Sequence, residues 1–345
     1  MASQRQRGGE GSLNVQGQEI EINVGVSVSE AMEIARQVVR ANMMEYAGIA
    51  QEVVDQRLEV FTSEFIRRTQ DHAPDTLGAL RDPDVQYGLF TAQKVFARTG
   101  AEKLGEMLID ILIARCKEPT QSFLAIVLNE AIETVGLLTP AQINALTVNW
   151  ICGETLYPYL KSTEDLAEWV RISVGPFTSD LPRHNAAYDH LVYAGCATLK
   201  ALAESLITVW KRKYSGLFSK GFSADMIPHQ FGEYASLFEP CTRGEDLLQV
   251  RGLNESYMEE LAKQKGAPEE FFYLLRNLHV SQLLSDDEVE AIIIDEIDEL
   301  RDLQEIWNSS RLRLLVPTSV GVAIAHSHWC RTTGSPSPLS AWIAE

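Results

Sequence analysis

The chain has 345 residues, of which 45% are hydrophobic and 23% charged, a composition typical of a soluble globular protein. Its 48 acidic and 30 basic residues leave a net charge of −18. This charge argues against a general binder of nucleic acids or anionic membranes, because both attract cations. No apolar run approaches the roughly 20 residues that span a bilayer, and residues 1–17 lack the apolar centre of a signal peptide. We therefore expect a cytoplasmic protein, and the five scattered cysteines predict reduced thiols.

The clearest strand pattern follows a polar segment, residues 1–18, that we expect to be flexible. Apolar and polar residues alternate over residues 19–28, which is the period of a half-buried strand. Such a lone strand must pair, either with the distant segment 311–316 or with the same strand of a second subunit. A short strand in a small intramolecular sheet is the alternative. The candidate oligomerisation residues are the apolar ones on this strand: Ile20, Ile22, Val24, Val26 and Val28.

From Ser27 onward the apolar spacing becomes helical. Ser27 and Glu30 match the capping box that begins many helices, and no proline follows before Pro74. The sequence therefore predicts one or two long helices over residues 28–68.

Capping residues and prolines divide the rest of the chain into successive elements. The predicted helices cover residues 83–99 and 101–117, begin at Pro140, at Thr163 and near Pro182, cover 199–214, and begin again after Ser285. The chain then closes with a strand over residues 311–316, a helix over 319–331 and a strand over 339–344.

These elements predict an all-α fold, either a multi-helix bundle or a solenoid-like stack of helical hairpins. A short N-terminal β-strand and a small β element at the C-terminus complete it. Four regions are expected: a flexible segment 1–18, a β-arm and long helix 19–75 for oligomerisation, a helical body 76–222, and an acidic helical region 223–345.

The charge is concentrated in one region. Residues 225–305 carry 20 acidic and 6 basic side chains, and the predicted helix after Ser285 carries most of the excess. Its carboxylates recur at helical spacing and form a candidate docking face for a basic protein partner: Asp295, Asp298, Asp302 and Glu305. A solvated helix face and a site for a hard dication are the alternatives. A basic stretch with interleaved aromatic residues, 200–222, precedes it and indicates either nucleic-acid binding or cations that face their own acidic neighbours.

Common catalytic signatures are absent, including phosphate-binding glycine loops, the nucleophile elbow and His-Glu-x-x-His. His326 and Cys330 are four residues apart and could present two ligands to zinc, although two ligands do not complete a tetrahedral site. A buried cysteine beside a hydrogen-bonded histidine is the alternative. The polar cluster of residues 183–190 is interpreted as structural, and no cofactor is expected.

Several segments in a shared order resemble an uncharacterised family of bacterial cytoplasmic, mostly helical proteins. They are IEINVGVSVSEAMEIARQVV at 20–39, DPDVQYGLFTAQKVFARTGAEKLGEMLIDILIAR at 82–115, IVLNEAI at 126–132, LTPAQ at 138–142 and TSVGVAIAHSHW at 318–329. The closing segment is also similar to the end of helical abortive-infection proteins, which implies a role in anti-phage defence. Neither resemblance implies a functional residue.

Two functional hypotheses follow. The favoured one is a non-enzymatic, self-assembling interaction protein, with a role in bacterial stress or anti-phage defence. The alternative is an effector enzyme with a His/Cys or carboxylate metal site in the C-terminal region.

Overall fold

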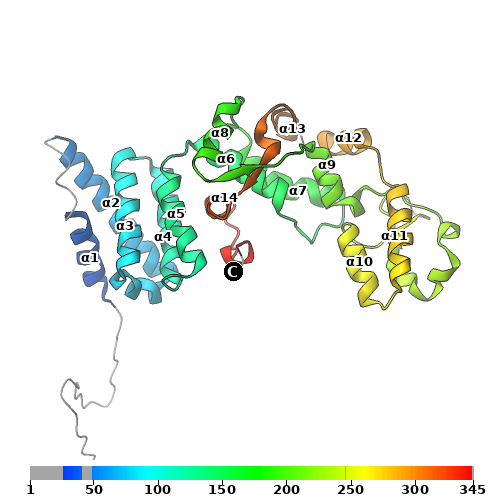
Figure 1. Ribbon diagram of the computed structural model, residues 1–345, viewed down its shortest axis with the longest axis horizontal. Helices are drawn as coiled ribbons and strands as arrows, with labels where there is room; N and C mark the ends of the chain where they lie inside the picture. The colour runs from blue at the N-terminus through cyan, green and yellow to red at the C-terminus, as the bar shows by residue number, and fades with distance from the viewer. Residues whose placement is uncertain (1–25, 41–48, 245, 298, 344–345) are drawn as a thin grey trace, which may run out of the picture.

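The computed structural model describes residues 26–40, 49–244, 246–297 and 299–343. The chain is predominantly α-helical, with a few short strands in small sheets, which confirms the predicted class (Figure 1).

The first helices lie side by side at one end of an elongated molecule (Figure 1). Each contributes an apolar stripe to a shared core, as the periodicity of the sequence requires. These elements are α1 (Val28–Arg40), α2 (Ile49–His72), η2 (Pro74–Arg81), α3 (Pro83–Thr99), α4 (Glu102–Lys117) and α5 (Phe123–Val135). The expectation of one or two long helices over residues 28–68 is thus met by α1 and α2.

The predicted start of the first helix is correct. The Ser27 amide donates to the Glu30 carboxylate at 2.9 Å, and the Glu30 amide donates to Ser27 Oγ at 3.2 Å. Val28 is therefore the first residue of α1 and not the end of a strand, and Val26 is buried before it outside any strand. Ile20, Ile22 and Val24 lie outside the described residues, so the oligomerisation arm stays a prediction.

The middle of the molecule contains α6 (Pro140–Asn149), η3 (Trp150–Glu154), α7 (Thr163–Ser173), η4 (Gly175–Phe177), α8 (Asn185–Tyr193), β1 (Ala197–Leu199), α9 (Leu206–Lys213) and η5 (Ser215–Phe218). A capping box at Thr139 and Gln142 starts α6, as predicted. The helix expected over 199–214 is shorter, because residues 197–199 pair as a strand and Ser205 Oγ accepts the Thr208 amide to begin α9.

A second, smaller apolar core lies at the far end of the molecule, beyond α9 (Figure 1). It is enclosed by η6 (Ala224–Met226), η7 (His229–Leu237), β2 (Phe238–Pro240), β3 (Leu248–Val250), α10 (Glu255–Gln264) and α11 (Glu269–Ser281). β2 and β3 pair antiparallel, with Phe238 opposite Val250.

The chain then returns to the middle of the molecule through α12 (Asp286–Glu296), α13 (Glu299–Ser309), η8 (Arg311–Leu314), β4 (Leu315–Pro317), α14 (Ser319–Thr333) and η9 (Leu339–Ala341). α14 packs against α4, α5 and α6. The predicted helix over residues 319–331 is thus correct.

Two terminal predictions need correction. Residues 311–314 form a helical turn, and the strand that follows, β4, pairs with β1 (Ala197 opposite Pro317). Most of the N-terminal segment predicted to pair with residues 311–316 lies outside the described residues. Residues 339–341 form a helical turn instead of a strand, because the amides of Trp342 and Ile343 both donate to the Leu339 carbonyl.

The first turn of α14 requires glycine at position 321. The Thr318 amide donates to the Cys196 carbonyl at 3.0 Å, which draws the first turn of α14 close to the end of β1. A Cβ atom at Gly321 would lie 1.9 Å from that carbonyl oxygen.

We predict that Gly321→Ala lowers the free energy of unfolding by about 3 kcal/mol, because backbone must move to admit the methyl group. Gly78→Ala is the matched control, since nothing lies within 4 Å of a Cβ there. Urea unfolding of both variants measures the difference. Equal stabilities would contradict the close approach.

Candidate functional site

An aromatic cleft lies between α7 and the C-terminal segment, residues 334–343. It encloses about 1100 Å³. The chain has six tryptophans, and four of them line the cleft: Trp150, Trp169, Trp329 and Trp342. The other two are fully buried elsewhere. Large aromatic side chains with partly exposed rings are a common feature of recognition sites.

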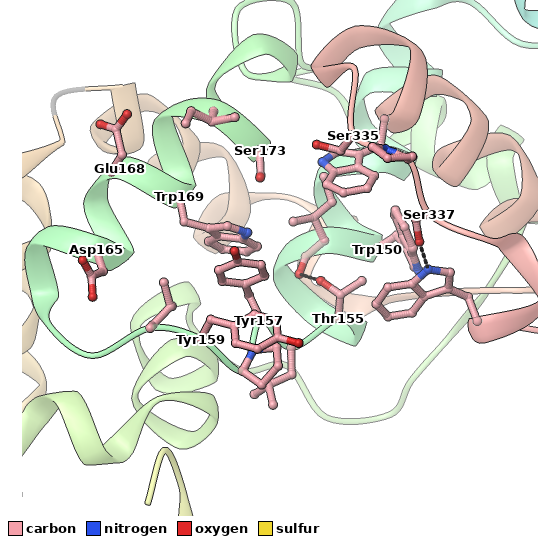
Figure 2. A pocket seen from close by; sticks show the side chains of 18 of the residues that line it. Trp150, Thr155, Tyr157, Tyr159, Asp165, Glu168, Trp169, Ser173, Ser335 and Ser337 are labelled. Carbon is pink, nitrogen blue, oxygen red and sulfur yellow. Dashed lines mark hydrogen bonds between the residues drawn. The ribbon is translucent and has the colours of Figure 1, made fainter.

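One wall of the cleft, the Trp150 wall, consists of Trp150, Trp329 and Trp342. The Trp150 ring meets Trp342 edge-on at 5.2 Å between centroids and Trp329 at 6.1 Å. Such edge-to-face pairs add stabilisation beyond the burial of area. The Trp342 indole N–H donates to Ser337 Oγ at 3.1 Å, a hydrogen bond within the C-terminal segment (Figure 2).

A π-helical turn at the end of α6 places Trp150. η3 covers Trp150–Glu154, and the Lys213 ammonium donates to the Cys152 carbonyl of this turn at 2.7 Å. Because Lys213 is buried, desolvation lowers its pKa to about 8, with smaller opposing effects of Cys152 and Glu154. Turns of this type often occur at functional sites, since they re-aim the side chains that follow.

The opposite wall, the Trp169 wall, consists of Tyr157, Tyr159 and Trp169. Tyr157 stacks on Trp169 with 5.9 Å between centroids, and Tyr159 meets Tyr157 edge-on at 5.4 Å. The Tyr157 amide donates to the Tyr214 hydroxyl at 3.2 Å, which anchors the loop to the body. Tyr159 is 73% exposed, so this wall presents aromatic surface to solvent.

Figure 2 shows two carboxylates beside the Trp169 wall, on α7. Asp165 and Glu168 are both exposed and stand nearly one turn apart. Asp165 accepts the Lys161 amide at 2.9 Å, and Glu168 forms a loose ion pair with Arg171 at 3.6 Å. Lys161 is the one basic residue that lines the cleft in the described part of the chain.

His326 and Cys330 lie behind the Trp150 wall, and α14 brings them together as their spacing predicts. The Cys330 sulfur is 3.5 Å from His326 Nε2, and the His326 ring meets Trp150 edge-on at 5.8 Å. Burial lowers the pKa of His326 to about 4 and raises that of Cys330 to about 11. Among the described residues no third His, Cys, Asp or Glu joins them in a cluster that could hold a metal ion.

The acidic face proposed as a docking surface does not lie on one helix. The predicted start at Ser285 is correct and includes a capping box, but Ile297 leaves the helical conformation, with φ −138° and ψ 88°. α12 and α13 are therefore separate. Asp302 and Glu305 share the exposed side of α13, where Glu305 lies 3.9 Å from Arg183. The Asp295 side chain and Asp298 lie outside the described residues.

The basic-aromatic stretch turns inward. Its aromatic residues are buried: Trp210, Tyr214, Phe218 and Phe222. Lys211 pairs with Asp286 at 2.7 Å and Lys220 with Glu288 at 3.1 Å, so these cations face the acidic α12. This arrangement matches the alternative in which the cations face their own acidic neighbours.

The polar cluster of residues 183–190 is distributed over structural contacts. The Tyr188 hydroxyl donates to the Pro182 carbonyl at 2.5 Å, Asp189 pairs with Arg311, and the His190 Nδ1 lies 3.0 Å from Gln142. These contacts hold α8 against η8 and α6, in agreement with the structural interpretation.

The aromatic cleft was not predicted from the sequence. Residues 150–169 contain four of its aromatic residues, and this density was a signal available in the chain. The second half, 329–342, is distant in sequence and joins only when α14 packs on α6.

Comparison with known proteins identifies the family but no activity. A family model matches residues 25–343, so the chain belongs to that family, which is uncharacterised. No curated protein and no solved structure matches the chain. Within the described residues, no helix combines the length and apolarity needed to cross a bilayer.

The buried histidines predict acid sensitivity. The pKa of His326 is about 4 in the folded chain and near 6.5 when unfolded, so the unfolded chain binds more protons between these values. Stability from this residue is present above pH 6.5 and is lost as the pH falls towards 4. His326→Gln should flatten the fall in unfolding free energy by up to about 1.4 kcal/mol per pH unit.

Urea unfolding between about pH 4 and pH 7 measures this slope. The exposed His184→Gln is the control. If both variants show the wild-type slope, His326 does not titrate as its burial requires.

Proposed function

We propose that this chain is a non-enzymatic interaction protein that binds a segment of a partner polypeptide in the aromatic cleft. The observation that carries the proposal is the pair of aromatic walls that face each other across the cleft. Rigid aromatic side chains supply large contact area at small entropic cost, which is why they dominate protein recognition surfaces.

The burial of the thiols and of the His279–Ser215 pair favours binding over catalysis as the role of this chain. Burial raises the pKa of Cys116, Cys152 and Cys196 to about 12, so these thiols stay protonated. His279 lies 2.8 Å from Ser215 Oγ, but both residues are buried away from solvent. The cleft itself is lined by aromatic rings, hydroxyls and two exposed carboxylates of a single helix.

The wider setting of the proposal comes from the sequence. Self-assembly through residues 19–28, a cytoplasmic location and a role in bacterial stress or anti-phage defence stay predictions. Self-assembly is compatible with a cleft that binds a partner, because α7, whose residues line the cleft, and α1 lie in different parts of the molecule (Figure 1).

Selection from a display library of random peptides tests the proposal. We expect peptides that bind the wild-type chain and that lose about tenfold in affinity with Tyr159→Ala, since an exposed aromatic anchor typically contributes 1–2 kcal/mol. Tyr159 is 73% exposed, so its removal should leave the fold intact. Tyr193→Ala, at a residue 88% exposed on α8, is the matched control.

Fluorescence anisotropy with labelled peptides gives the affinities. If no selected peptide depends on Tyr159, or if Tyr193→Ala has the same effect, the cleft does not bind polypeptides.

A further inference from the structure

The C-terminal segment places a proline-containing stretch at the border of the cleft, next to the Trp150 wall. Gly334, which has a positive φ of 69°, caps the end of α14, and the chain continues as Ser335-Pro336-Ser337-Pro338. Pro338 has φ −74° and ψ 130°, close to the polyproline II conformation. Ser335, Pro336 and Ser337 line the cleft, so a proline-containing segment of the chain itself forms part of its border.

The Trp169 wall is a second aromatic surface of the cleft, and it is exposed to solvent. Tyr157, Tyr159 and Trp169 are partly or largely exposed, and the apolar side chain of Ile172 beside them on α7 is 50% exposed. Aromatic-lined grooves recognise polyproline II segments because these segments are extended before binding and lose little entropy.

The charge on this wall favours a cation next to the proline-containing segment. Asp165 and Glu168 lie on the exposed side of α7 beside Trp169. Lys161 lines the cleft near them, and Glu168 forms a loose ion pair with Arg171 at 3.6 Å. An arginine or lysine of a partner would meet these carboxylates and the face of an aromatic ring together.

We propose, building on the function proposed above, that the Trp169 wall recognises a proline-rich segment of a partner protein in which a basic residue adjoins the prolines. The prolines pack on Tyr157, Tyr159 and Trp169. The basic residue pairs with Asp165 and Glu168, and binding therefore weakens as salt rises.

The peptide selection gives the first readout. Peptides that depend on Tyr159 should be enriched in proline and in arginine or lysine. Synthetic copies of the best peptide, with proline changed to alanine or arginine changed to glutamate, should each bind about tenfold more weakly. Tyr159-dependent peptides without prolines or cations, such as apolar helical peptides, would overturn this inference and leave the proposed function intact.

Charge variants give the second readout. Asp165→Asn/Glu168→Gln should remove most of the preference for arginine over glutamate in the peptide and leave the affinity for an uncharged proline-rich peptide unchanged. The matched control is Asp302→Asn/Glu305→Gln, an exposed pair with the same spacing on α13. If the control variant loses the preference instead, the basic residue docks on the acidic α13 and the inference is wrong.

Discussion

The packing of α14 against α4, α5 and α6 is the interaction on which the rest of the structure depends. The bond from the Thr318 amide to the Cys196 carbonyl holds the first turn of α14 beside β1, and Gly321 has no side chain to prevent this approach. The same contact aligns β4 with β1 and brings Trp329 opposite α7. Without it, the aromatic cleft would have only the half that residues 150–173 supply.

Several basic side chains of this protein form ion pairs with its own acidic residues. The acidic α12 follows α11 and packs against α9, where the basic residues of 211–220 meet its first turn. Pairing of opposite charges across two helices reduces the repulsion that a net charge of −18 would otherwise cause. Asp165 and Glu168 beside the cleft are exposed, and Glu168 forms a loose ion pair with Arg171.

The cleft combines order and exposure in a way that suits recognition. Its base is held by the Lys213 contact to the η3 turn and by the Tyr214 hydroxyl, both buried. Its edges carry Tyr159 and the Ser-Pro-Ser-Pro segment, which are more exposed. A rigid base limits the entropy lost on binding, and exposed aromatic edges supply contact area. The thiols and histidines near the cleft are kept neutral by burial.

The sequence by itself determined the helical class and many of the helix starts, because a cap is a hydrogen bond between residues three positions apart. Ser27 with Glu30, Thr139 with Gln142, and Ser285 with Glu288 form as predicted. Tertiary structure alone decided the break at Ile297, the pairing of β1 with β4 and the assembly of the cleft. The strand pair joins segments more than 100 residues apart, and the cleft joins residues 150–173 with 329–342. Periodicity records which side of an element is buried, but it carries no information on which distant element covers that side.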